Sequence, residues 1–231
     1  MSSRNNLKPA TPTSRNPLTR KLLAVLPRRT QAERLAETRS RIIAATVSYI
    51  DERGFHQTSL QQIAKVAGVT VGAVQHHFAN KMELLTAVVE DSFGQLAESM
   101  RNVAFEGASL EERIKLFVDQ CWDFCNSPRY QASLHILLGM RSDHGEPEKF
   151  ESWLHATLGR VMSEGFDRWR EVFGDVALDE QEQFDTLLYL FSSLSGTSLL
   201  ARISQSKERV ANDLRVLNEL LLLKFRQARR A

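Results

Sequence analysis

The sequence has few of the residues on which several protein classes depend. Its 231 residues include 2 cysteines, too few for a disulfide scaffold or a four-cysteine zinc site. The longest stretch without a charged residue runs from 186 to 201, whereas a membrane-spanning helix needs about 20 predominantly apolar residues. The apolar run 22–26 is too short for a signal peptide and is followed by Pro-Arg-Arg. We therefore expect a soluble, cytoplasmic protein.

Signatures of catalysis and metal binding are also missing. The sequence contains no glycine-rich phosphate loop, no nucleophile elbow and no His-x-x-x-His spacing. His76 and His77 are adjacent, so on a helix they point about 100° apart and chelate a metal poorly. Cys121 and Cys125 are four residues apart on one helical face, where a disulfide is strained, so we expect two buried thiols. We expect no metal and no cofactor, and a helical enzyme is the weakest alternative.

The chain as a whole is nearly neutral, with a net charge of +2. Residues 1–84, however, contain 13 Lys/Arg and 5 Asp/Glu, a net charge of +8, so residues 85–231 carry a net charge of −6. Such asymmetry indicates nucleic acid or a membrane surface as the partner of the basic part. A basic tail that is merely solvated is the simpler alternative.

Residues 1–29 form a basic tail with several prolines and no acidic residue. Because proline resists helix formation, we expect this tail to be disordered. One role for it is an arm that brings Arg28 and Arg29 into the minor groove of DNA. Deletion of residues 1–29 without loss of DNA affinity would argue against that role.

Beyond residue 30 the apolar residues recur with a helical period, without sustained alternation and without a hairpin turn. This pattern predicts an all-α fold of about nine helices. With 42% hydrophobic residues, the chain is too apolar to be wholly disordered. The predicted helices are 30–53, 59–66, 70–77, 80–104, 109–126, 129–141, 147–173, 179–205 and 207–228.

Three of these helices are crowded into a short segment that ends near residue 78. Ser59, with Gln62 three residues later, forms a capping box for the second helix. Gly68 can adopt the left-handed conformation that a tight helix–helix turn requires, and Thr70 can cap the third helix. This order predicts a helix-turn-helix, although any helical hairpin within a bundle would show a similar pattern.

The second helix of a helix-turn-helix enters the major groove, where its N-terminal residues meet the base edges. Here these residues are small, namely Val71, Gly72 and Ala73. Small side chains permit close approach of the backbone and apolar contact with thymine methyl groups. Together with the basic charge, the segment favours DNA binding.

The stretch 58–85 resembles the N-terminal DNA-binding domain of the tetracycline-repressor (TetR) family. The resemblance also rests on the preceding helix 41–45, the Gly54-Phe55 corner and the ending His77-Phe78-x-x-Lys81-x-x-Leu84. It covers about residues 36–85, while the rest of the chain matches only in length and helical character.

The resemblance implies a homodimeric transcriptional regulator, usually a repressor, that binds a palindromic operator. Base contacts are implied for Thr70, Val71, Gly72 and Ala73, and for Gln61, where some members carry a base-reading side chain. Contacts with the phosphate backbone are implied for Ser59, Gln75, His76, His77 and Lys81. The family commonly has tyrosine at the position of Gln75, so a glutamine there can read adenine or donate to a phosphate.

The resemblance further divides the chain into a helix-turn-helix domain, 30–84, and an effector-binding and dimerisation domain, 85–231. The last two helices would form the homodimer interface, and an ordinary internal core is the alternative. The residues proposed for this interface are Ser192, Ser195, Gly196, Leu214, Leu217 and Leu221. A subset of aromatic and polar residues would line a pocket for a small apolar or aromatic effector, although most aromatics belong to the core. The pocket candidates are Trp122, His135, Trp153 and Phe166.

In this hypothesis, effector binding shifts the helix 80–104, which joins the two domains, and changes the spacing of the recognition helices. Half-sites about 34–36 Å apart cannot both be bound when that spacing changes. The alternative within the same family is a constitutive DNA-binding protein without an effector.

Overall fold

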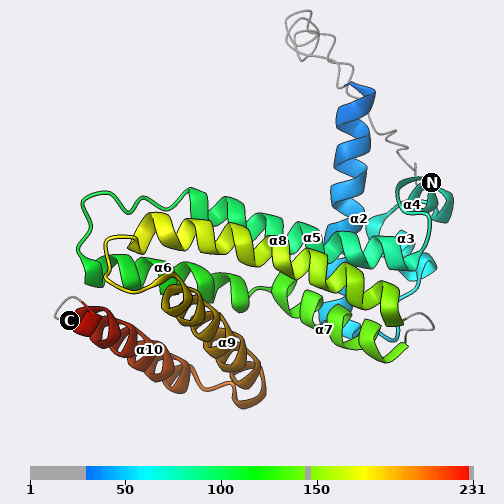
Figure 1. The fold of residues 1–231 in the computed structure, drawn as a ribbon. Helices are drawn as coiled ribbons and strands as arrows, with labels where there is room; N and C mark the ends of the chain where they lie inside the picture. Colours follow the sequence, from blue (N-terminus) through cyan, green and yellow to red (C-terminus); the bar gives the residue numbers. More distant parts are fainter. Residues whose placement is uncertain (1–29, 144–146, 229–231) are drawn as a thin grey trace, which may run out of the picture. The chain divides into compact units, whose positions relative to one another are not determined.

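The computed structural model describes residues 30–143 and 147–228 (Figure 1). The basic tail 1–29, including Arg28 and Arg29, lies outside the described residues. The described chain forms nine helices and no strand, so the prediction of an all-α fold is confirmed. None of the described helices combines the length and apolar character that a membrane span requires. The helices are α2 (Gln31–Arg53), α3 (Leu60–Ala67), α4 (Val71–His77), α5 (Lys81–Arg101), α6 (Leu110–Cys125), α7 (Pro128–Asp143), α8 (Pro147–Phe173), α9 (Glu180–Ser204) and α10 (Lys207–Ala228).

The predicted helix ends lie within two residues of the observed ones except at the end of α5. The apolar period predicts a helix to residue 104, whereas α5 ends at Arg101. The guanidinium of Arg168 in α8 donates hydrogen bonds to the carbonyl oxygens of Met100, at 3.1 Å, and Val103, at 2.9 Å. The last carbonyls of a helix need such external donors, so a residue distant in sequence supports the end of α5.

The chain divides into two units, residues 1–39 and residues 40–231. The described part of the first unit is residues 30–39. It starts with reciprocal hydrogen bonds, in which Thr30 N donates to Glu33 Oε2 at 2.8 Å and Glu33 N donates to Thr30 Oγ1 at 3.2 Å. This arrangement is a capping box, which explains why α2 begins at residue 31.

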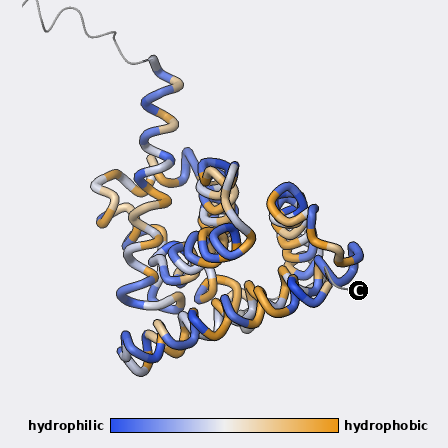
Figure 2. Tube along the Cα trace, turned by 90° about the vertical axis from the view of Figure 1, so that its left-hand side faces the viewer, coloured by the Kyte–Doolittle hydropathy of each residue, from blue (hydrophilic) through white to orange (hydrophobic). Residues whose placement is uncertain are grey.

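Most helices of the second unit are amphipathic and bury an apolar face, whereas α7 and α9 carry apolar residues around most of their circumference. Along its tube, hydrophilic and hydrophobic segments alternate within each long helix, as Figure 2 shows. Helix α5 packs against α6, α7 and α8, and α6 packs against α9 and α10. Helix α5 follows α4 after residues 78–80, so along the chain it connects the helix-turn-helix to the helical bundle.

An aromatic cluster fixes α10 to this bundle. Phe225 of α10 is fully buried, with its ring centroid 5.8 Å from that of Trp169 and 5.2 Å from that of Phe173, both in α8. Phe117 of α6 completes the cluster, 5.2 Å from Trp169 in edge-to-face geometry. Edge-to-face aromatic pairs are typically worth about 0.5–1.5 kcal/mol beyond the burial of area.

Candidate nucleic-acid interface and ligand cavity

The turn between α3 and α4 has the geometry that the sequence predicts. Ser59 Oγ accepts a hydrogen bond from Gln62 N at 3.3 Å and caps α3, but among the described hydrogen bonds the return bond from Ser59 N to the Gln62 side chain, which a full capping box requires, is missing. Gly68 ends α3 with φ 65°, a left-handed conformation that disfavours side chains with a Cβ. Thr70 Oγ1 accepts from Ala73 N at 3.1 Å, which starts α4. Local capping therefore determines the angle at which α4 leaves the turn.

The N-terminal end of α4 presents small groups to solvent. Thr70 and Gly72 are exposed, while Val71 and Ala73 are half-buried. Val74, one residue further, is completely buried and anchors α4 to the core. Side chains on one side of the helix are therefore held in the protein while the opposite side is open to a groove of DNA.

The residues with a predicted phosphate contact surround this surface. Gln75 and His76 are exposed, and Ser59, His77 and Lys81 are half-buried. Gln61, the candidate for a further base contact, is exposed on α3. The hydroxyl oxygens of Ser59 and Thr70 accept capping bonds, but each hydroxyl hydrogen can still be donated to a phosphate oxygen. The rings of His76 and His77 are 5.5 Å apart in edge-to-face geometry, and the described residues contain no metal-ligating group of three.

A cavity of about 310 Å³ lies among α5, α6, α8 and α9. Its inner part is apolar and includes Phe93, Phe117, Leu187 and Phe191. Cys121 also lines it, and burial raises the pKa of this thiol, which stays protonated and contributes an uncharged surface. A concave, mainly apolar site with a few polar groups is the usual form of a small-molecule pocket, and this volume is at the small end of the usual range.

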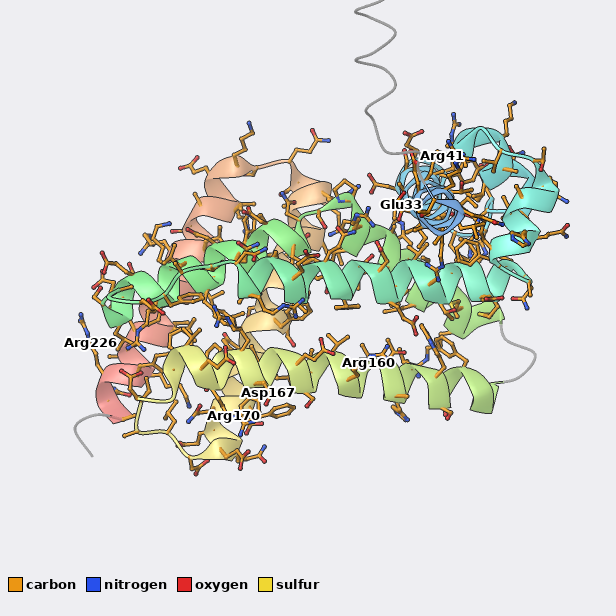
Figure 3. All side chains as sticks on the ribbon, turned by 90° about the horizontal axis from the view of Figure 1, so that it is seen from above. Glu33, Arg41, Arg160, Asp167, Arg170 and Arg226 are labelled. Atoms are coloured by element: carbon orange, nitrogen blue, oxygen red, sulfur yellow. The ribbon has the colours of Figure 1, made fainter. Side chains whose placement is uncertain are left out.

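Charged side chains surround the cavity. Arg160 of α8, whose place is labelled in Figure 3, forms an ion pair with Glu90 of α5 at 3.6 Å. Arg168 binds Glu171 at 2.7 Å as well as the carbonyls at the end of α5. Arg101 forms no ion pair with any of the residues that the structure describes. The cavity therefore offers an apolar interior beneath a polar rim.

The four residues predicted for the effector pocket do not line this cavity. His135 is exposed on α7, whereas Trp122 of α6 is half-buried. Trp153 packs beside Phe150, with ring centroids 6.0 Å apart, and Phe166 packs beside Phe184 at 5.4 Å. Trp122 and Phe166 each follow a cavity-lining residue, Cys121 and Gly165, and adjacent helical residues point about 100° apart.

Lining residues that were not among the four pocket candidates include Phe93, Leu187 and Phe191, together with Gly94 and Ala97 of α5. The small residues Gly94 and Ala97 are three positions apart, a spacing that leaves room on one face of a helix. This spacing could have indicated a cavity beside α5. The large apolar lining residues could not be distinguished from core residues in the sequence, because the same apolar pattern predicts a core position and a cavity wall.

The residues predicted for a homodimer interface have mixed environments. Ser192 and Gly196 are exposed, and Leu214 is half-buried. Ser195 Oγ is 2.6 Å from Tyr130 Oη, with which it shares a hydrogen bond inside the chain. Leu217 and Leu221 are 6% and 4% exposed, so both pack within the chain.

The exposed apolar residues of α9 and α10 lie on other sides of these helices than the buried ones. We call this set the α9–α10 apolar face. Ile203 is its most exposed member, at 73%. The side of α10 that carries Leu217 and Phe225 packs into the bundle, so the side that carries Leu220 and Leu223 is exposed to solvent. The face comprises Leu188, Tyr189, Leu199, Leu200 and Ile203 of α9 with Val216, Leu220 and Leu223 of α10.

The helix-turn-helix region is similar in sequence to known proteins. Residues 42–88 match the family described as bacterial regulatory proteins, tetR family. The HTH-type transcriptional regulator CymR of Pseudomonas putida is 29% identical over 182 residues, which are 79% of this chain and 88% of CymR. The HTH-type transcriptional regulator BetI of Escherichia coli is 37% identical over 87 residues, 37% of this chain and 45% of BetI. The similarity to BetI thus spans less than half of that protein.

Solved structures share the fold over most of the chain. A transcriptional regulator from Rhodococcus sp. Rha1 has a TM-score of 0.64 at 18% identity, covering 80% of this chain and 96% of its own. The transcriptional regulator FadR from Bacillus subtilis, solved in complex with stearoyl-CoA, has a TM-score of 0.61 at 22% identity. That likeness covers 79% of this chain and 96% of FadR. At these identities the likenesses establish the fold.

Proposed function

Because this chain belongs to the TetR family of bacterial regulatory proteins, we propose that it is a ligand-responsive repressor that binds a palindromic operator as a homodimer. The observation that carries the proposal is the capped turn between α3 and α4, which leaves the small N-terminal residues of α4 open to solvent. Since DNA is its partner, we expect the protein to act in the cytoplasm.

In this proposal, Val71, Gly72 and Ala73 approach base edges while Lys81 and the polar residues at the end of α4 contact phosphates. Phosphate contacts set the orientation on the duplex and base contacts set the sequence preference. Each subunit reads one half-site, and the two recognition helices lie about 34–36 Å apart on one side of the duplex.

The homodimer would use the α9–α10 apolar face. Large exposed apolar patches are uncommon on monomeric proteins and mark sites of association. The exposed serine and glycine in the same helix, Ser192 and Gly196, would allow the α9 helices of two subunits to approach closely. A face that is self-complementary fits the two-fold symmetry of a palindromic operator.

The effector would occupy the cavity among α5, α6, α8 and α9. Its apolar interior suits a small apolar or aromatic molecule, and its rim can bind one polar group. The acyl-CoA complex of Bacillus subtilis FadR supports ligand binding by this fold. A ligand that widens the space between α5 and α8 would move α5, which is joined to α4 by only the three residues 78–80.

The experiment is a thermal-shift screen of small apolar and aromatic compounds, followed by operator-binding assays with each compound that raises the melting temperature. A compound that binds only the native state must raise it. We expect at least one such compound to weaken operator binding by about 5- to 150-fold, the usual range of allosteric coupling. Compounds that bind but leave operator affinity unchanged would indicate a constitutive DNA-binding protein instead.

A matched pair of variants locates the site. Ala97→Phe places a large side chain in the cavity, whereas Ala156→Phe places it on the exposed side of α8. The first variant should lose the thermal shift and the second should keep it. Equal shifts in both variants would place the ligand elsewhere.

A further inference from the structure

Phe55 lies in the loop between α2 and α3 and is 7% exposed. Gly54, with φ 82°, makes the turn that follows α2 and points the chain back toward the bundle. The loop is held by hydrogen bonds from Thr58 N to Phe55 O, at 3.0 Å, and from Thr58 Oγ1 to Gly54 O, at 3.1 Å. These hydrogen bonds fix the backbone from which the Phe55 ring projects.

The ring of Phe55 packs directly on the backbone of α7 at Gly139. A Cβ atom on residue 139 would lie within 2.6 Å of three ring carbons of Phe55. Real Cβ contacts are longer than that, so any larger residue at this position would displace the ring or move α7. Gly139 thus forms a seat for Phe55, and the seat links the helix-turn-helix to the bundle.

The ammonium group of Lys81 lies over the same ring, with its Nζ 4.7 Å from the ring centroid. Lys81 is the first residue of α5, where the helix dipole disfavours a cation. Its placement is therefore not explained by the stability of α5. A cation over an aromatic face is attracted by the ring quadrupole, which limits the directions that the flexible lysine side chain samples.

Helix α7 also contacts the wall of the cavity. The ring of Tyr130 lies 6.3 Å from that of Phe93 and 5.8 Å from that of Phe191, and both of these residues line the cavity. Gly139 is on the same helix. One helix thus contacts both the cavity wall and the seat of Phe55.

We propose that Phe55 is a positioning residue for DNA binding: seated on Gly139, its ring holds Lys81 in the direction of a DNA phosphate. The inference rests on the proposed phosphate contact of Lys81. It adds that the strength of this contact depends on α7, so that movement of the cavity wall can change operator affinity through Phe55 as well as through α5.

The test is a double-mutant cycle on the full-length protein with a duplex selected from random DNA by the wild-type protein. Phe55→Leu keeps an apolar side chain but removes the aromatic face, and Phe55→Tyr retains that face. For a dimer with two such pairs, Phe55→Leu should weaken binding by about 5- to 30-fold at low salt and should lower the salt dependence. Phe55→Tyr should restore both, and Phe55→Leu should have no further effect in the Lys81→Ala background.

Gly139→Ala tests the seat. It should weaken DNA binding in the wild-type background and leave binding unchanged in the Lys81→Ala background. Gly159→Ala is the matched control, because it also replaces a helical glycine but its Cβ would meet nothing within 4 Å. If Gly139→Ala does not fold, as judged by circular dichroism, the Phe55 cycle still decides the question.

Equal losses from Phe55→Leu with and without Lys81 would overturn the proposal, because the ring would then support the fold alone. So would a Phe55→Leu protein with unchanged affinity and salt dependence. If Lys81→Ala itself changes neither quantity while the wild type binds DNA, the phosphate contact is absent and the proposal fails with it. Failure of the wild type to select any duplex would instead refute DNA reading as a whole.

Discussion

Ile203→Glu is expected to dissociate the homodimer without unfolding the chain. Ile203 lies near the end of α9 and is the most exposed member of the α9–α10 apolar face, at 73%. Because the side chain contributes little to packing within the subunit, its replacement removes mainly what a second subunit would bury. A glutamate would also place two like charges at the symmetric interface.

The magnitude follows from the exposed fraction. Complete burial of an isoleucine side chain contributes about 1.5–3 kcal/mol, so burial of the exposed part of Ile203 contributes about 1–2 kcal/mol in each subunit. Two subunits lose about 2–4 kcal/mol. At about 1.4 kcal/mol for each factor of ten, the dissociation constant of the dimer should rise by about 30- to 700-fold.

Sedimentation equilibrium over a range of protein concentrations measures this change directly, with the 26.2 kDa monomer as the reference mass. Leu138→Glu is the control, since Leu138 is exposed to a similar extent, 69%, but belongs to α7 and not to the α9–α10 apolar face. The reasoning is refuted if the wild type is a monomer at micromolar concentration. It is also refuted if both variants shift the equilibrium equally.

Three further predictions concern DNA binding and pH. Lys81→Ala should weaken binding uniformly across DNA sequences and lower the slope of log affinity against log salt by about 0.9 per subunit, measured by fluorescence anisotropy; an unchanged slope would exclude the phosphate contact. Substitution of Val71 by a larger residue should change the selected DNA sequence, and uniform weakening instead would contradict its base contact. Burial raises the pKa of the Cys125 thiol to about 12, while an unfolded thiol titrates near about 8.5. The free energy of unfolding should therefore have its full value below about pH 8.5 and decrease progressively toward pH 12. In urea unfolding curves, the free energy of unfolding of Cys125→Ala should decrease less over this range. An equal decrease in both proteins would show that Cys125 does not cause the loss.

The features that the sequence predicts well are those determined by neighbouring residues. The caps at Ser59 and Thr70 and the left-handed Gly68 each depend on contacts within about four residues, so the turn between α3 and α4 could be predicted in detail. The family resemblance then assigned that turn to DNA binding. Most of the long helices could be predicted because they have an apolar stripe with a helical period, although α7 and α9 lack a distinct stripe.

The features that the sequence predicts poorly depend on contacts between distant helices. The end of α5 is supported by Arg168, more than sixty positions away, and no local signal indicates it. Cys121 and Trp122 are equally plausible cavity residues by composition, and only the packing of α6 decides which one points inward. The seat of Phe55 on Gly139 is likewise invisible in the sequence, where Gly139 is an ordinary glycine within a helix.

Selection of duplexes from a random DNA pool by the purified wild-type protein tests the central claim most directly. The account predicts enrichment of a palindrome whose half-sites lie about 34–36 Å apart, or a multiple of that spacing, because two copies of α4 read one side of the duplex. Enrichment of a single unrepeated site would contradict operator binding as a homodimer. Failure to enrich any sequence would contradict sequence-specific binding altogether.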